Sequence, residues 1–271
     1  MFDWASLLKS GPCYIGILNC TPDSFSDGGQ FVEPTAALHQ ALRLVEDGAK
    51  VIDVGAESTR PGAPPISEAE EWSRIEKILP ILRHELPAET LLSIDTRHES
   101  TARRALDLGV AILNDVTGFS GSKMLHLLRD KSIGAIAMRS TVVNNTFSMP
   151  PYADPRSDIS GKFDELFSLS ARLQAASVNP QQCLMDIGFG FGTTYREDAA
   201  LWDQLIYHKT ELAWPHSRFC IGISRKRLLA WRSEQPDLPP EQRDALTWEA
   251  ISILLSEGYR FFRVHAVPRY P

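Results

Sequence analysis

The sequence predicts an α/β fold, a TIM (β/α)8 barrel formed by one domain over residues 1–271. Eight short apolar runs alternate with segments of helical spacing, the pattern of a parallel barrel. Gly48, Gly109 and Gly258 end predicted helices, and the next apolar run begins three residues after each. A doubly wound open sheet is the alternative. It needs fewer strands and usually a glycine-rich dinucleotide turn, and no GxGxxG follows the first run.

The apolar runs predict the strands. In chain order they are Tyr14–Leu18, Val51–Val54, Leu91–Ile94, Ile112–Leu113, Ala135–Met138, Cys183–Met185, Phe219–Ile223 and Phe261–Val264. Helical spacing is clearest at Leu38, Ala41, Leu42 and Val45, and again at Leu246, Ala250, Ile253 and Leu254. The irregular stretch Ser140–Ser157 predicts a loop.

One element of the repeat is predicted to be missing. Only Ala266–Pro271 follows the eighth strand and its His265, so we expect no eighth helix. The outer face of that strand then needs another cover. We expect either Phe2–Lys9, with Phe2, Trp4, Leu7 and Leu8, or a second subunit, and the shortness of Phe2–Lys9 favours a homodimer.

Composition excludes several classes of protein. The formal net charge is 28 − 34 = −6, which disfavours nucleic acid as a partner. No stretch reaches the roughly 20 apolar residues of a membrane span, and the N-terminus lacks the pattern of a signal peptide. The four cysteines form no CxxC pair, so we expect reduced thiols and a cytoplasmic protein.

Polar residues follow the predicted strands, at the end where barrel enzymes place their sites. Seven strands contribute: Asn19 after the first, Asp53 in the second with Glu57–Gly62 beyond it, Asp95-Thr96 after the third, Asn114-Asp115 after the fourth, Asp186–Gly192 after the sixth, Ser224-Arg225-Lys226 after the seventh, and Arg263 with His265 at the eighth. This convergence on one face predicts an enzyme.

Each group also has a simpler interpretation. Asp95 could cap the helix that follows it, and Asn114-Asp115 could be turn residues. Ser224–Lys226 could be a solvated helix start, although two cations there oppose the helix dipole. Arg263 and His265 share strand parity, and both pointing into a barrel mouth would need an anion.

Taken together, these side chains form two sets. Asp95, Asn114 and Asp186 can pair with the N–H donors of a flat amino-pyrimidine ring. A cationic set can hold a phosphate or pyrophosphate, with Asn19 placing Mg²⁺ beside it; its members are Arg60, Lys226, Arg263 and His265. The sequence therefore predicts a flat polar heterocycle with a pyrophosphate leaving group.

Several long motifs of the sequence resemble those of a known protein family. They are GILNCTPDSFSDGG, VIDVGAESTRPGA, SIDT, LNDVTGF, GFGFG, GISRKR and RVHAV, and they occur over Ile15–Val267 in the order found in dihydropteroate synthases, which the chain resembles. The resemblance implies a TIM barrel that joins 6-hydroxymethyl-7,8-dihydropterin pyrophosphate to p-aminobenzoate with Mg²⁺, giving 7,8-dihydropteroate for folate biosynthesis.

The resemblance also implies roles for individual residues. The pterin site would use Asp95, Asn114, Met138, Asp186 and Lys226. The p-aminobenzoate and pyrophosphate sites would use Phe25, Thr59, Arg60, Pro61, Ser224, Arg263 and His265, with Asn19 as the metal ligand. Catalysis would involve Asp23, Asp53, Lys226, Arg263 and His265, and two loops, 23–29 and 59–62, would close to exclude water.

The sequence departs from the family pattern at four places. Arg139, Ile187, Thr193 and Ala266 stand where the family usually has His, Pro, Lys and Asp. Two other functions are therefore kept open. A pterin-binding methyltransferase would share the pterin site but release no pyrophosphate, and a non-catalytic pterin-binding paralogue could keep every ligand contact.

Overall fold

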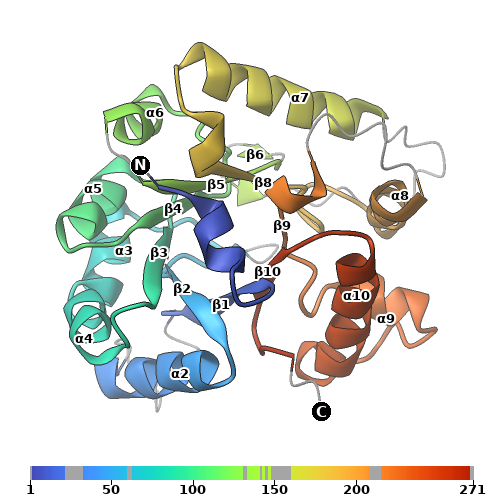
Figure 1. Cartoon of the computed structure of the whole chain (residues 1–271), viewed down its shortest axis with the longest axis horizontal. Coiled ribbons are helices and arrows are strands. Elements are labelled where there is room, and N and C mark those ends of the chain that lie inside the picture. The colour runs from blue at the N-terminus through green and yellow to red at the C-terminus, as the bar shows by residue number, and fades with distance from the viewer. Residues whose placement is uncertain are drawn as a thin grey trace.

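The computed structural model describes residues 2–21, 33–59, 63–130, 133–140, 142–143, 146–147, 160–207 and 215–268. Eight parallel strands close into a barrel in the order β1-β10-β9-β8-β5-β4-β3-β2 (Figure 1). They are β1 (Cys13–Asn19), β2 (Ala49–Gly55), β3 (Leu91–Asp95), β4 (Ile112–Asp115), β5 (Gly134–Met138), β8 (Cys183–Asp186), β9 (Phe219–Ile221) and β10 (Phe261–Val264). The predicted fold class is confirmed.

Helices form the outer ring. They are α2 (Pro34–Glu46), α3 (Glu68–Ile75), α4 (Ile78–Glu85), α5 (Glu99–Asp107), α6 (Ser122–Asp130), α7 (Ser160–Ala175), α8 (Tyr195–Tyr207), α9 (Arg227–Arg232) and α10 (Asp244–Ser256). Short 3-10 helices are η1 (Trp4–Leu8), η2 (Pro180–Gln182), η4 (His216–Arg218) and η5 (Pro240–Arg243). Within the predicted loop 140–157, β6 (Val142–Val143) pairs with β7 (Thr146–Phe147). Across the described ranges, no helix has the length and apolar character needed to cross a membrane.

Glycines end the three predicted helices as expected. Gly48, Gly109 and Gly258 have φ angles of +106°, +88° and +96°. This left-handed conformation is easily adopted only by glycine, and it turns the chain out of the helix toward the next strand. The regular glycines that end the predicted helices are therefore explained by the left-handed backbone conformation needed at those positions.

The barrel interior is apolar at the N-terminal ends of its strands. Side chains from seven strands form one cluster there, with Leu91 of β3 packed against it; the seven-strand set includes Cys13, Ile15, Val51, Ile112, Ile136, Leu184, Cys220 and Phe261. Trp4 of η1 is 2% exposed and packs edge-on against Phe261 with ring centroids 5.4 Å apart. Its indole Nε1 donates to the carbonyl of Gln182 at 2.8 Å. In Figure 1 this blue N-terminal segment lies across the ring of strands.

The N-terminal segment therefore does not have the role expected from the sequence. Phe2, Trp4, Leu7 and Leu8 pack against the inward-facing cluster at the barrel floor, not against the outer face of β10. The ring of Phe2 lies so close to Gly134 that a Cβ there would be 2.7 Å from it, so a larger residue at this position would displace the Phe2 ring. The expectation that residues 2–9 replace an outer helix is wrong.

The outer face of β10 is covered within the chain. Phe262 and Val264 are fully buried and belong to the main core beneath the helices. The ring of Tyr14 on the neighbouring strand lies 6.1 Å from that of Phe262. Residues 265–268, which follow β10 in the described part of the chain, form no helix but bring Val267 into the same core. An uncovered last strand is therefore no longer an argument for a dimer.

Candidate active site

The polar residues predicted at the strand ends converge inside the barrel mouth. Strand alternation places four of them two residues beyond an apolar floor residue on the same strand; the pairs are Val51 and Asp53, Ile112 and Asn114, Leu184 and Asp186, and Phe261 and Arg263. Asp95 aligns with Asn114 on β4, and Met138 of β5 aligns with Asp186 on β8. The parallel register thus assembles residues that are far apart in sequence.

Arg263 lies at the centre of a partly buried ionic network. Its Nε donates to Oδ2 of Asp53 at 2.6 Å, and its Nη2 donates to Oδ2 of Asp95 at 2.6 Å. The amide of Asn114 donates to the same Asp53 oxygen at 2.9 Å. Burial alone would lower the pKa of Arg263, but the carboxylates of Asp53 and Asp95 raise it above its ordinary value. Two carboxylates of the chain itself therefore balance the charge of Arg263, without an external anion.

Asp95 is part of this network and does not cap a helix. The residue before α5 is His98, whose side chain makes no cap hydrogen bond. Burial raises the pKa of Asp95 above its ordinary value, and the nearby Arg263 guanidinium opposes that shift. The simpler interpretation of Asp95 as a helix cap is wrong.

Asn114 and Asp115 have different environments although they are adjacent. Asn114 faces the barrel interior, whereas Asp115 accepts hydrogen bonds from the backbone N–H groups of Thr117 and Phe119 at 2.8 and 3.0 Å. Asp115 therefore organises the turn after β4, and the turn interpretation holds for this residue alone.

Lys226 and Asp186 form a second charged region. Asp186 is 5% exposed and accepts from the N–H of Gly188 at 2.8 Å. The Lys226 ammonium lies 4.4 Å from the centre of the Phe191 ring. Burial lowers the pKa of Lys226 to about 8, although the carboxylates of Asp198 and Asp186 act in the opposite direction. This cation is well placed to pair with an anionic or carbonyl group of a ligand.

The remaining residues of the Ser224–Lys226 motif have distinct partners. Ser224 Oγ lies 3.0 Å from Nδ1 of His265, and it also accepts from the backbone N–H of His265 at 3.1 Å. Arg225 has a left-handed φ of +58° and forms a double hydrogen bond with Asp244 at 2.7 and 2.8 Å. Arg225 therefore anchors α10, while Ser224 links β9 to β10 at the mouth.

Among the residues that the structure describes, two places could hold a metal ion. Asn19 is half-buried at the end of β1, in register with Gly55, which itself pairs with Asp95. Glu57, Glu71 and His98 also bring ligand atoms within 4.8 Å of one another. However, both oxygens of Glu57 accept from Arg97 at 2.8 Å, which neutralises this carboxylate. The amide oxygen of Asn19 therefore fits a hard cation better, provided that a ligand supplies further oxygens.

Four predicted residues lie outside the described residues: Asp23 and Phe25 in 22–32, and Arg60 and Pro61 in 60–62. Thr59 is half-buried at the start of the second of these segments. Their predicted roles stay predictions.

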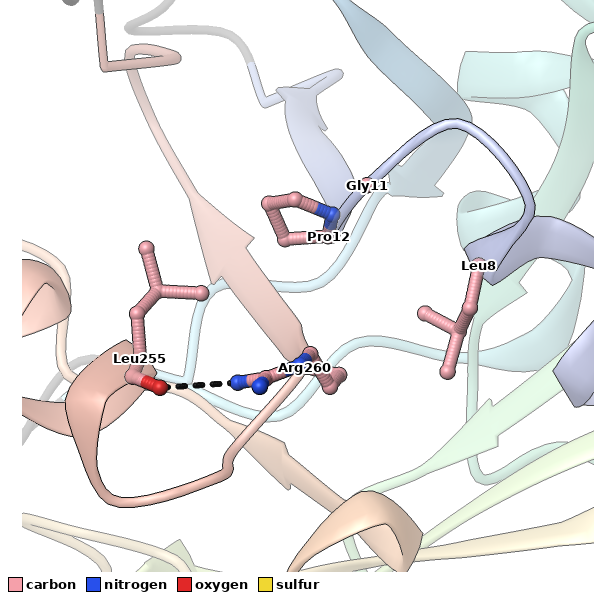
Figure 2. Close-up of a pocket in the computed structure, with 5 residues that line it drawn as sticks. All are labelled: Leu8, Gly11, Pro12, Leu255 and Arg260. Carbon is pink, nitrogen blue, oxygen red and sulfur yellow. Dashed lines mark hydrogen bonds between the residues drawn. The ribbon is translucent and has the colours of Figure 1, made fainter.

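A hollow of about 350 Å³ lies at the opposite end of the barrel (Figure 2). It is lined by Leu8, Gly11, Pro12, Leu255 and Arg260. Arg260 already donates to the carbonyl oxygens of Leu255 and Tyr259 at 2.8 and 2.7 Å. None of the polar groups at the mouth lines this hollow, so it is not the site that the sequence predicts.

Sequence reasoning missed two side chains that organise the mouth. Arg139 and Asp198 bind the backbone of residues 187–191. Arg139 directly follows β5, and this position at a strand end is the sequence signal that could have predicted a role at the mouth.

Comparison with known proteins agrees with this geometry. The family model described as "Pterin binding enzyme" matches residues 15–265. The dihydropteroate synthase of Synechocystis is 35% identical over 98% of this chain and 88% of its own, and that of Streptococcus pyogenes is 36% identical over 96% and 92%. The Xanthomonas albilineans enzyme, solved with 4-aminobenzoic acid, superposes with a TM-score of 0.80 at 31% identity, covering 95% of this chain and 89% of that one. The Anaplasma phagocytophilum enzyme, with bound 6-hydroxymethylpterin-monophosphate, has a TM-score of 0.79 at 35% identity and 94% coverage of both chains.

Fold and site together define a (β/α)8-barrel enzyme of the pterin-binding class. Within that class the chain belongs to the dihydropteroate synthase family, whose members are transferases of folate biosynthesis.

Proposed function

We propose that this enzyme condenses 6-hydroxymethyl-7,8-dihydropterin pyrophosphate with p-aminobenzoate, giving 7,8-dihydropteroate and pyrophosphate. The observation that carries the proposal is the partly buried network at the mouth, where Asp53, Asp95, Asn114 and Arg263 meet across four strands. We propose that residues 1–271 act as a single pterin-binding domain. A methyltransferase would use the same polar residues at the mouth but would have no leaving pyrophosphate to bind.

The pterin would lie over the acidic residues at the barrel mouth. Asp95, Asn114 and Asp186 offer acceptors to a flat ring with several N–H donors, and Met138 supplies an apolar contact. Burial raises the pKa of Asp186 above its ordinary value. N–H donors from a ligand would stabilise the carboxylate and lower its pKa again. Lys226 would pair with an acceptor on the same ring.

The pyrophosphate would lie between the late strands and the end of β1. Arg263 is held by Asp53 and Asp95, so we propose that these carboxylates orient it toward the leaving group. His265 and Ser224 form a hydrogen-bonded pair beside it. Mg²⁺, held by the amide oxygen of Asn19 and by pyrophosphate oxygens, would supply positive charge to the leaving group.

The amine substrate would enter between the two loops beyond β1 and β2. We propose that Phe25, Thr59, Arg60, Pro61 and Ser224 form this subsite, and that Asp23 supports the first loop. Closure of both loops would exclude water from the reacting carbon.

The reaction would be dissociative. The C–O bond to pyrophosphate breaks first, and its electron pair leaves with the pyrophosphate oxygen. The resulting pterin methylene cation is held above Asp95 and Asp186, whose negative charge stabilises it. The amine nitrogen of p-aminobenzoate then forms the new C–N bond and loses a proton to solvent.

Pyrophosphate release tests the proposal directly. The purified chain is incubated with both substrates and Mg²⁺, and pyrophosphate and dihydropteroate should appear in equal amounts. Calorimetry with pyrophosphate alone separates the alternatives. Binding that is tighter with Mg²⁺ and lost in Arg263→Ala supports the synthase, whereas no binding at millimolar concentration favours a methyltransferase. Ligand binding without turnover would indicate a non-catalytic paralogue.

We further propose a cytoplasmic homodimer that uses the outer faces of the late helices. Trp231 on α9 and Ile253 on α10 are 45% and 41% exposed, so they offer apolar contacts on these faces. Sedimentation at micromolar concentration should show a dimer, and Ile253→Glu should shift it toward monomer. A monomeric wild-type chain would contradict the dimer without affecting the proposed reaction.

A further inference from the structure

Arg139 is buried beside the site, and the proposed reaction gives it no role. It directly follows β5 and is 2% exposed. Its Nε donates to the carbonyl of Ile187 at 2.7 Å, and its Nη2 to that of Gly188 at 2.8 Å, with a longer contact of 3.4 Å to Phe191. Its Nη1 donates to Glu165 of α7 at 3.0 Å. One guanidinium therefore binds three carbonyl groups of a single loop, residues 187–194 between β8 and α8.

The far side of the β8–α8 loop is fixed by α8. Oδ1 of Asp198 accepts from the N–H of Gly190 at 3.0 Å and from the hydroxyl of Thr193 at 2.6 Å. Gly188, within the loop, has a left-handed φ of +70°, and a Cβ there would lie 1.9 Å from the carbonyl oxygen of Arg139. Only glycine fits this contact. Both the backbone and the side chain of residue 139 therefore set the path of the loop.

The β8–α8 loop forms the wall around the two charged groups of the pterin subsite. Gly188 N donates to Asp186, the Phe191 ring faces the Lys226 ammonium, and a Cβ at Gly190 would lie 3.6 Å from the Lys226 side chain. A shift of the loop would therefore displace the partners of Asp186 and Lys226 together.

We propose that Arg139 is a positioning residue for the pterin subsite: its guanidinium fixes the β8–α8 loop against β5 and so fixes the surroundings of Asp186 and Lys226. This inference rests on the proposed function of that subsite. The planar fork of arginine directs several N–H donors at once, whereas a lysine ammonium in the same place could not reach three carbonyl groups in these directions.

The chain provides variants with which to test this role. Arg139→Lys keeps the charge but removes the fork, and Thr193→Val loosens the loop from the side of α8 if Arg139→Lys folds poorly. Arg218→Met is the matched control. Arg218 also donates to a carbonyl of β8, that of Cys183, at 3.2 and 2.7 Å, but at the floor end of the strand.

Three readouts separate positioning from general stability. By calorimetry, Arg139→Lys should weaken binding of 6-hydroxymethylpterin about tenfold, the effect expected for one charge-assisted hydrogen bond. The KM for p-aminobenzoate should stay within about twofold, because its subsite lies at the other loops. The alkaline limb of kcat/KM should move to higher pH, because a looser loop hydrates Lys226 and raises its pKa. Thr193→Val should act in the same direction with a smaller effect.

The outcomes distinguish the two proposals. If the wild-type chain does not bind 6-hydroxymethylpterin, the proposed function fails. If the wild type binds it and both loop variants bind equally well, with only a lowered Tm, Arg139 is merely structural and the inference is overturned. It is also overturned if Arg218→Met weakens pterin binding as much as Arg139→Lys.

Discussion

The two ends of the barrel interior differ in chemistry although the same strands build both. At the N-terminal end, inward positions such as Val51, Ile112 and Phe261 form an apolar floor closed by Trp4. Two residues further along, the corresponding positions are Asp53, Asn114 and Arg263, joined by hydrogen bonds and ion pairs. The inward-facing residues of the same strands thus stabilise the fold at one end of the barrel and form a polar site at the other.

The difference shows how each end tolerates burial. Apolar side chains at the floor are stabilised simply by leaving water. At the mouth, Asp53 is fully buried, and the hydrogen bonds that Arg263 and Asn114 donate to it offset the cost of removing its side chain from water. Loss of an apolar group at the floor leaves a cavity, whereas loss of one partner at the mouth leaves an unpaired charge.

The largest effect is expected from Arg263→Met. This change should lower the free energy of unfolding by about 3–5 kcal/mol, because it leaves the buried Asp53 and the half-buried Asp95 without their cation. Synthase activity should disappear as well. Urea unfolding and the pyrophosphate assay measure the two effects.

A double variant checks the cause. Asp53→Asn added to Arg263→Met removes one of the unpaired charges, so part of the lost stability should return. If the double variant is less stable than the sum of the single changes predicts, the unpaired charge is not the cause.

Trp4→Ala tests the other end of the comparison. It should lower the free energy of unfolding by roughly 3–4 kcal/mol through a cavity at the floor and a lost hydrogen bond to Gln182. The KM values of both substrates should stay unchanged in the folded fraction. Trp4→Phe, which keeps the ring packing, is the control and should lose only about 1 kcal/mol. A changed KM in Trp4→Ala would mean that the two ends are coupled.

The strand alternation explains how much of this fold could be predicted from the sequence. Strand positions and glycine caps depend on local periodicity and backbone conformation, so β10 was predicted with its bounds and Gly48 with its role. β9 ends at Ile221, earlier than predicted, and Gly222 lies against the Asp186 carboxylate, where a Cβ would be 3.1 Å from Oδ2. That close approach is a property of two strands together, so neither strand reveals it alone.

Residue partners were harder to predict than residue positions. Arg263 was expected to need an external anion, but Asp53 and Asp95 supply negative charge from strands more than 160 residues away. Trp4 was assigned to the wrong face because hydrophobicity does not say which end of a barrel a short segment closes. Partner choice depends on register across the barrel, which a single sequence does not encode locally.

A smaller effect is expected at the rim of the mouth, where Glu71 is 1% exposed. Burial raises the pKa of Glu71 to about 7, although the hydroxyls of Thr101 and Thr96 act in the opposite direction. The folded chain therefore holds a proton between about pH 4.5 and 7 that the unfolded chain releases, and this contribution to stability is lost as pH rises through that window. Glu71→Gln stays neutral, so at pH 8 it should be more stable than wild type by roughly 1–3 kcal/mol.

Chemical unfolding at pH 5 and pH 8 provides the measurement for Glu71. The two proteins should have similar stability at pH 5 and differ at pH 8. An equal difference at both pH values would mean that Glu71 is ionised throughout and that Gln alters only its contacts with Thr96.

The smallest expected effect concerns Lys226, and it reports on the mouth alone. Burial lowers the pKa of Lys226 to about 8, so the ammonium is lost as pH rises through that value. If the proposed pterin contact needs the ammonium, kcat/KM for the pterin substrate at pH 8 should be about half its value at pH 7, and should fall tenfold per unit above pH 9. Lys226→Arg keeps its charge at every pH in this range, so its profile should lack the alkaline limb even if its rate is lower. Trp4→Ala should keep the wild-type profile, because the floor does not contribute to the burial of Lys226. An alkaline limb that persists in Lys226→Arg would assign the titration to another group and would remove Lys226 from the proposed pterin contacts.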